Sequence, residues 1–226
     1  MRILNLLLTG LIIFLNQEPK LFLLNKQQYS LNIDMEDTIR NSFQDSIDTK
    51  KLFIDDRSLV EQVEKTAEKL IACLNNKGKI FFAGNGGSFA DSQHLTAEFI
   101  SRFLFDRDSL PAIALGTNNS NISAIGNDYG YDFVFSREIS ALGSPNDVFI
   151  PISTSGNSKN IILAAKEAMK IGLEVIGLTG KQGGSLSTIC ECIKVPSDEI
   201  PRIQECHILI GHILCQISEE RIFKHT

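Results

Sequence analysis

The sequence predicts an α/β protein built on a mostly parallel sheet, and three observations support this. Short apolar runs alternate with longer stretches in which apolar residues recur at helical spacing. Two of the short runs end in loops of glycine, serine and asparagine, just before a helical pattern begins. The 226 residues are 43% hydrophobic, which is enough for a full core without disulfides. Strands separated by helices imply a parallel sheet covered on both faces, with ligands at the carboxyl ends of its strands.

The first 34 residues do not share this alternation. Their apolar run from Ile3 to Leu15 resembles the core of a signal peptide, but it is shorter than the roughly 20 residues that cross a bilayer. No small-residue cleavage site follows it. Apolar spacing of the helical kind starts at Met35. We therefore expect residues 1–34 to be an extension outside the fold and residues 35–226 to form one domain; a membrane anchor at the N-terminus is the alternative.

From Met35 onward, the elements follow in a regular order. Helical spacing of apolar residues predicts helices at 36–49, 58–75, about 90–104, 131–142, 158–171, 185–188 and 201–223. The segment 120–127 is predicted to be helical or irregular. Short apolar runs bounded by turn residues predict the strands, at 79–83, 112–115, 147–152, 174–178 and 190–195. Pro201 suits the first turn of the last helix.

Charge and cysteine content narrow the class of protein. A net charge of −5 leaves no excess of Lys and Arg to neutralise nucleic-acid phosphates, so no nucleic-acid partner is expected. The five cysteines are an odd number without zinc-type spacing, which indicates reduced thiols and a cytoplasmic protein. We expect Cys73, Cys206 and Cys215 to be small core residues. Cys190 and Cys192 are two residues apart and are expected on the same face of a strand.

The two loops of glycine, serine and asparagine that follow short apolar runs suit an anion. Unpaired N–H groups and the positive end of the dipole favour phosphate at a helix N-terminus. The glycine loop, Gly84 to Ser88, matches no complete nucleotide motif, and a tight turn without a ligand is its alternative. The serine loop, Ser153 to Ser158, places four hydroxyls within six residues. A helix cap needs one hydroxyl, so we expect phosphate here rather than a plain cap.

Four further polar residues are candidates for chemistry. His94 and Glu98 lie four residues apart, about 6 Å along a helix and on one face. This spacing suits two metal ligands or an acid/base pair, and an exposed ion pair is the alternative. Gln204 and His212 lie in the apolar last helix. His212 taken alone could equally be a hydrogen-bonded core residue.

Several separated motifs carry a family resemblance. They are Asn85-Gly86-Gly87-Ser88, Asp91-Ser92-Gln93-His94, Gly126-Asn127-Asp128-Tyr129-Gly130, Ser153-Thr154-Ser155-Gly156-Asn157-Ser158, Leu178-Thr179-Gly180, and Arg202-Ile203-Gln204-Glu205 followed by His212. From about Met35 to the C-terminus, the chain resembles the phosphoheptose isomerases of the sugar isomerase (SIS) superfamily. The resemblance implies a three-layer sandwich around a five-stranded flavodoxin-like sheet, a homotetramer, and one zinc ion per active site on His94, Glu98, Gln204 and His212. Pro201 departs from the pattern, because some relatives carry an acidic residue there.

The resemblance also implies an activity. It is the conversion of sedoheptulose 7-phosphate to D-glycero-D-manno-heptose 7-phosphate through an enediolate, for bacterial surface glycans. Such a reaction needs a base and an acid, for which we expect Glu98 and His212 respectively. The expected substrate-binding residues are Asn85, Gly86, Gly87, Ser88, Glu98, Asn127, Asp128, Ser153, Thr154, Ser155, Ser158 and Gln204. The alternative is a non-catalytic SIS protein that binds a replication initiator or senses a sugar phosphate.

Helix geometry adds one expectation about assembly. Gln204 and His212 are about 12 Å apart along one helix, whereas donors on one zinc ion lie within roughly 4 Å of each other. Either the helix breaks between them or two chains contribute. The apolar run from Ile208 to Leu214 disfavours a break. We therefore expect active sites shared between subunits, with His212 contributed across the interface.

Overall fold

A computed structural model describes residues 34–224, so the predicted extension lies almost wholly outside the described residues. Contacts divide the chain into two compact units, 1–43 and 44–226. The division falls inside the first described helix, α2 (Met35–Asp55). Every helix within residues 34–224 is too short or too polar to cross a membrane. The strands found within residues 34–224 and the candidate site residues belong to the second unit.

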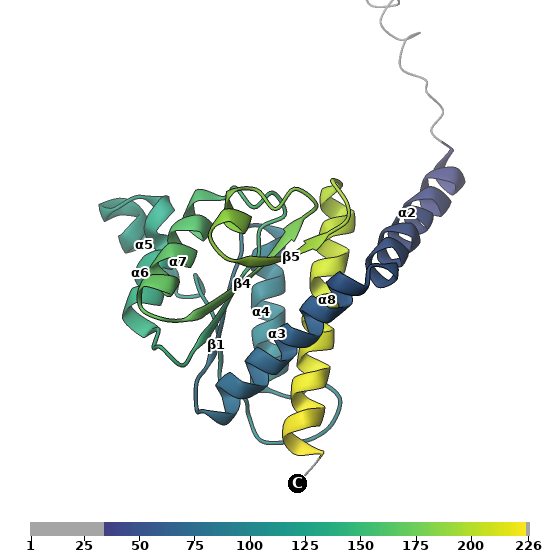
Figure 1. Ribbon diagram of the computed structural model, residues 1–226. Coiled ribbons are helices and arrows are strands. Elements are labelled where there is room, and N and C mark those ends of the chain that lie inside the picture. Colours follow the sequence, from purple (N-terminus) through teal and green to yellow (C-terminus); the bar gives the residue numbers. More distant parts are fainter. Residues whose placement is uncertain (1–33, 225–226) are drawn as a thin grey trace, which may run out of the picture. The chain divides into compact units, whose positions relative to one another are not determined.

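The second unit contains a five-stranded sheet, which confirms the predicted fold class (Figure 1). Its strands are β1 (Ile80–Ala83), β2 (Ala112–Ala114), β3 (Val148–Pro151), β4 (Glu174–Gly180) and β5 (Glu191–Val195). They pair in the order β2-β1-β3-β4-β5, and every pairing is parallel. The residues of β1 and β3 are all buried, as expected for strands with helices on both faces.

Two layers of helices cover the sheet (Figure 1). One layer contains α3 (Arg57–Asn75), α4 (Gly87–Ile100) and α8 (Ile200–Phe223). The other contains α5 (Asn119–Asp128), α6 (Val134–Leu142) and α7 (Lys159–Lys170). Two short 3-10 helices, η1 (Tyr131–Phe133) and η2 (Ser185–Thr188), accompany the second layer. Alternate strand residues enter different cores. Ile80 and Phe82 of β1 belong to the core under α3, α4 and α8, while Phe81 belongs to the core under α6 and α7.

The helix predicted to reach residue 104 instead ends at Ile100. Its last carbonyls are taken by Arg107, whose guanidinium donates to the oxygens of Phe99 (2.7 Å) and Glu98 (2.9 Å). Arg107 also pairs with Glu219 of α8 at 3.1 Å, and both side chains are almost fully buried. The Glu219 carboxylate accepts three amides, those of Phe103, Leu104 and Phe105. This buried ion pair holds residues 101–110 as a loop, a long-range cause that helical periodicity cannot reveal.

The helices α4 and α8 run in parallel, and their close contact positions the candidate residues. A side chain at Gly211 of α8 would place its Cβ 2.4 Å from a methyl carbon of Leu95 in α4. At Gly87, where α4 begins, an added Cβ would lie 2.5 Å from the amide nitrogen of Gln204 in α8. Two levels of contact, roughly two helical turns apart, therefore join the helices.

Candidate functional site

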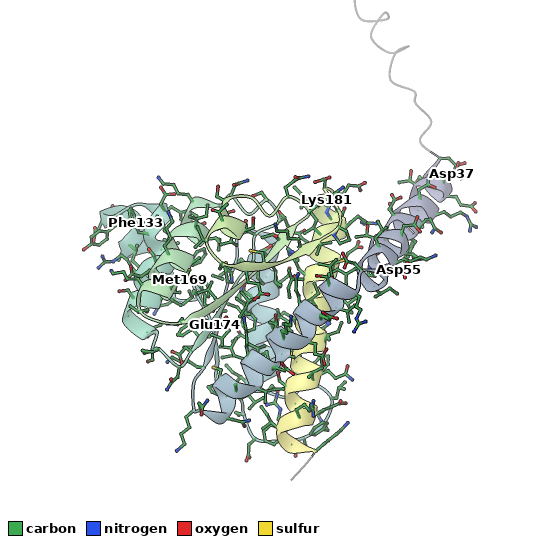
Figure 2. All side chains as sticks on the ribbon, in the orientation of Figure 1. Asp37, Asp55, Phe133, Met169, Glu174 and Lys181 are labelled. Atoms are coloured by element: carbon green, nitrogen blue, oxygen red, sulfur yellow. The ribbon has the colours of Figure 1, made fainter. Side chains whose placement is uncertain are left out.

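The two predicted anion loops lie at the carboxyl ends of the neighbouring strands β1 and β3. This edge is marked in Figure 2 by Lys181, just past the end of β4, while Glu174 marks the opposite end of that strand. A reciprocal pair of amide hydrogen bonds, each 2.9 Å, joins Asn85 of the glycine loop to Asn160 of α7. The Tyr131 hydroxyl also donates to the Asn85 oxygen at 3.2 Å. The glycine loop is thus joined to the first turn of α7, which directly follows the serine loop.

The Ser158 hydroxyl of the serine loop does not cap the helix that follows. Ser158 occupies the N-cap position of α7, but its side chain makes no capping hydrogen bond. Its hydroxyl instead lies 3.2 Å from the Ser153 hydroxyl. Gly156 turns the chain with φ of +65°, and a Cβ there would lie 2.0 Å from the Gly183 oxygen. Thr154 and Ser155 line an open pocket together with Lys181.

Three residues beside the loops were not predicted from the sequence, namely Lys181, Asn160 and Tyr131. Lys181 directly follows the Leu178-Thr179-Gly180 motif and brings a cation to the pocket beside the serine loop. Lys181 could have been predicted, because it directly follows a strand. Asn160 and Tyr131 could not, because their contacts are with Asn85, which lies 75 residues from Asn160 and 46 residues from Tyr131 in the sequence.

In the glycine loop, the predicted residues differ in accessibility. Gly86 has φ of +57° and nothing within 4 Å of an added Cβ, so its backbone faces open space. Gly87 lies against the Gln204 amide. Ser88 is only 3% exposed, because it already lies inside the first turn of α4. The predicted contact between Ser88 and substrate stays a prediction.

A second cluster lies further along α4 and α8. The Nε2 atoms of His94 and His212 are 2.9 Å apart, and His94 Nε2 is 3.5 Å from Glu98 Oε1. The Phe103 ring packs against His212, with ring centroids 5.4 Å apart. Burial and the neighbouring His94 lower the pKa of His212, against an opposing effect of Glu98. The neutral imidazole of His212 is therefore favoured at neutral pH.

His212 was expected to come from a neighbouring subunit, but within this chain it already lies beside His94. The helix α8 is continuous through Gln204 and His212, as predicted, but His212 meets His94 and Glu98 of its own chain. Gln204 is separated from His94, Glu98 and His212, because its side chain contacts Gly87 at the beginning of α4. The sequence predicted that His212 and Gln204 would not reach one metal ion within a single chain, and this stays a prediction. Which of the two lies with His94 and Glu98 depends on the parallel register of α4 and α8, which the sequence does not reveal.

Asn127 and Asp128 lie at the exposed end of α5. The Asn127 amide donates to the Asp128 carboxylate at 2.8 Å. Among the described residues, no hydrogen bond joins this pair to the serine or glycine loop. The link to the site is indirect and passes through Tyr131, three residues further along the chain.

Three side chains have the chemistry of a catalytic zinc centre. Two imidazoles and a carboxylate are a known donor set, with a fourth position open. Nitrogens bound to one tetrahedral zinc at 2.0–2.1 Å stand about 3.3 Å apart, so His94 and His212 would need to separate by only ~0.4 Å. Within residues 34–224, no three His, Cys, Asp or Glu side chains are already arranged around a metal position. The donor set fits zinc after a small movement of the rings.

Comparisons with known proteins identify the family of this chain. A family model described as "SIS domain" matches residues 45–180. The phosphoheptose isomerase of Aneurinibacillus thermoaerophilus is 51% identical over 192 residues, which cover 84% of this chain and 97% of that protein. Phosphoheptose isomerase 2 of Campylobacter jejuni is 49% identical over 82% of this chain and 92% of its own length.

Solved structures give the same result. A phosphoheptose isomerase from Francisella tularensis superposes with a TM-score of 0.79 at 38% identity, covering 83% of this chain and all of that chain. The enzyme from Neisseria gonorrhoeae gives a TM-score of 0.77 at 41% identity, covering 82% and 99% respectively. The shared fold, the length covered and the level of identity establish that this chain belongs to the phosphoheptose isomerase family of SIS-domain proteins.

Proposed function

We propose that the protein isomerises sedoheptulose 7-phosphate to D-glycero-D-manno-heptose 7-phosphate, for bacterial surface-glycan synthesis. The observation that carries the proposal is the cluster of His94, Glu98 and His212, held within 3.5 Å on two packed helices. A module that only binds a sugar phosphate or a partner protein has no use for this set. Relatives about half identical to the chain and named phosphoheptose isomerase support the choice of substrate.

The reaction moves a proton between C1 and C2 of the sugar. Glu98 is the base, with one carboxylate oxygen free to take the proton. His212 is the acid: its neutral ring has one N–H, which it donates to the sugar oxygen. His94, Glu98 and His212 would hold zinc, which when bound would polarise the carbonyl and hydroxyl oxygens of the substrate. His94 also orients His212 through their ring contact.

The two loops hold the rest of the substrate. The hydroxyls of Ser153, Ser155 and Ser158 and the Lys181 ammonium bind the phosphate. Asn85 contributes one N–H, because its oxygen already accepts from Asn160 and Tyr131 and its other N–H is donated to Asn160. Asn85 therefore recognises an acceptor oxygen of the sugar.

The distance between loops and cluster supports a site shared between subunits. Glu98 is eleven residues beyond Gly87, about 16 Å along α4, and Gln204 lies with Gly87. That span exceeds the length of an extended seven-carbon sugar phosphate. We propose that the loops and Gln204 of one chain face the His94, Glu98 and His212 cluster of a neighbour. Gln204 of the neighbouring chain would then be the fourth residue to hold zinc.

An apolar groove supports assembly into the proposed homotetramer. Phe53, Ile54, Val60, Leu209 and Ile213 are among its lining residues. Three of them are strongly exposed: Ile54 is 67%, Val60 44% and Leu209 41% exposed. Exposed apolar patches on this scale mark protein interfaces. The five reduced cysteines are consistent with the proposed cytoplasmic location.

The proposed reaction converts a ketose into an aldose of the same mass. A test of function must therefore separate the two sugars. Purified protein is incubated with sedoheptulose 7-phosphate in ²H₂O, and the product is resolved by chromatography and NMR. We expect an aldoheptose phosphate, with deuterium at C2 where the transferred proton exchanges with solvent. Glu98→Gln should abolish conversion while leaving a folded oligomer. Binding of the sugar phosphate without any conversion, in zinc-loaded wild-type protein, would favour the non-catalytic alternative.

A further inference from the structure

Two thiols stand together where β5 begins, outside the site described above. The Sγ atoms of Cys190 and Cys192 are 3.9 Å apart, and both cysteines are reduced. Cys190 is half-buried and therefore reachable from solvent, while Cys192 is 8% exposed. The Cys192 sulfur fills space left by Gly177 of β4, where an added Cβ would lie 2.6 Å from it. The remaining cysteines, Cys73, Cys206 and Cys215, are buried in the core under α3, α4 and α8.

The spacing of the two sulfurs indicates what they can bind. A disulfide requires about 2.05 Å between sulfurs. Two thiolates on one tetrahedral ion, with metal–sulfur bonds of about 2.3 Å, stand about 3.8 Å apart. The observed 3.9 Å between the two sulfurs matches two thiolates on one metal ion and is far longer than a disulfide bond. We propose that Cys190 and Cys192 form a dithiol site that binds one thiophilic metal ion or metalloid through both sulfurs.

The surroundings favour a thiolate in this pair. A hydrogen bond from the Cys190 thiol lowers the pKa of Cys192; burial opposes this, and the Lys194 ammonium adds to the lowering. The same interaction, together with burial, raises the pKa of Cys190. Cys192 thus loses its proton first, and Cys190 loses its own when an electrophilic centre binds. Thiolates are the form of cysteine that binds soft metals.

The dithiol is connected to the serine loop through η2, and this part of the inference rests on the proposed function. The Cys190 amide donates to the Leu186 oxygen at 3.1 Å, and the Leu186 amide donates to the Gly156 oxygen at 2.9 Å. The Ser185 amide donates to the Asn157 side chain, also at 2.9 Å. A centre bound to Cys190 adds atoms beside η2 and would therefore displace η2 and, with it, the loop that holds phosphate.

The probe is phenylarsine oxide, which does not need histidine or carboxylate ligands. Its As=O group condenses with two thiols to form two As–S bonds and one water molecule, with no change in oxidation state. Native mass spectrometry of the full chain should find one arsenical per chain, with one water lost. Cys190→Ser and Cys192→Ser should each abolish this adduct, whereas the matched control Cys73→Ser should keep it.

Three results would overturn the site: no adduct in the wild type, an equal adduct in the Cys190→Ser/Cys192→Ser double variant, or a loss of two hydrogens that reports a disulfide instead. The mass measurement needs no substrate, so it stands even if the isomerase assay fails. In active enzyme, the arsenical should raise KM for the sugar phosphate several-fold in the wild type and leave the double variant unchanged. An unchanged KM in the wild type would contradict the link to the serine loop.

Discussion

Ser158 has the position of a helix cap, yet its hydroxyl bonds elsewhere. It lies 3.2 Å from the Ser153 hydroxyl and leaves the first amides of α7 without a side-chain cap from this residue. A hydroxyl cluster held away from capping is available for the oxygens of a phosphate. The residue pattern alone predicted this use, because four hydroxyls exceed what one helix end needs.

The first prediction concerns these hydroxyls. Ser155→Ala combined with Ser158→Ala should raise KM for the sugar phosphate by an order of magnitude or more, since each lost hydrogen bond to a charged group is worth roughly 1.5–3 kcal/mol. Thermal stability should change little. The matched control is Ser140→Ala, an exposed serine on α6. A double variant with wild-type KM and a lower unfolding temperature would identify the loop as a cap.

The second prediction concerns His207, which is fully buried in α8 and bonds through Nε2 to the Thr179 oxygen at 3.1 Å. Burial lowers its pKa to about 4, against an opposing effect of the Thr179 carbonyl. Between pH 6.5 and 4, the unfolded chain therefore binds a proton that the folded chain excludes. The contribution of His207 to the free energy of unfolding should be complete above pH 6.5 and should fall as the pH drops toward 4. At pH 4.5 the loss should be about 2–3 kcal/mol.

His207→Gln removes this titration and retains an N–H donor for Thr179. Urea unfolding at pH 7 and pH 4.5 should find a smaller loss on acidification in the variant than in the wild type. Equal losses in both proteins would mean that His207 does not stay neutral in the fold.

At the scale of elements, the pattern of short apolar runs predicted every strand to within two residues at each end, because most strand residues are buried between two helix layers. Helix ends were less predictable. The end of α4 depends on Arg107 and Glu219, which are 112 residues apart in sequence. The contact between α4 and α8 was equally invisible in sequence, although it is the contact that positions His212.

The third prediction tests that contact. Gly211→Ala would bring its Cβ within 2.4 Å of Leu95, a fully buried side chain with little room to move. We expect a loss of stability of about 1–3 kcal/mol and a fall in kcat, because α8 must shift and carries His212 away from His94. Leu95→Ala added to Gly211→Ala makes room for the methyl group and should recover part of kcat. A single variant with unchanged kcat would show that the two helices need not approach this closely.

At the scale of the whole molecule, the proposal of a shared site starts from the spacing of two residues in the sequence. Gln204 and His212 are eight positions apart in one unbroken helix, about 12 Å along its axis, which favours ligands from two chains. Which residues stay together could not be predicted, because it depends on the packing register of α4 against α8. The structure groups His94, Glu98 and His212 and separates Gln204 from them.

The central claim is that each active site joins the cluster of one chain to the loops and Gln204 of another. It predicts an asymmetry between two mixtures of inactive variants. Glu98→Gln mixed with Gln204→Ala should regain activity, because some sites combine an intact cluster with an intact Gln204; random exchange of subunits gives about a quarter of the sites. Glu98→Gln mixed with His212→Asn should regain none, because no chain in that mixture has an intact cluster.

The most direct measurement is therefore the isomerase activity of both mixtures after subunit exchange, with mixed oligomers verified by native mass spectrometry. Glu98→Gln mixed with the Ser155→Ala/Ser158→Ala variant provides a second pairing of cluster with loop, and it should also recover activity at substrate concentrations far below KM. Recovery in the first mixture and none in the Glu98→Gln with His212→Asn mixture is the predicted result. Recovery in the Glu98→Gln with His212→Asn mixture, or no recovery in the first, would contradict the account.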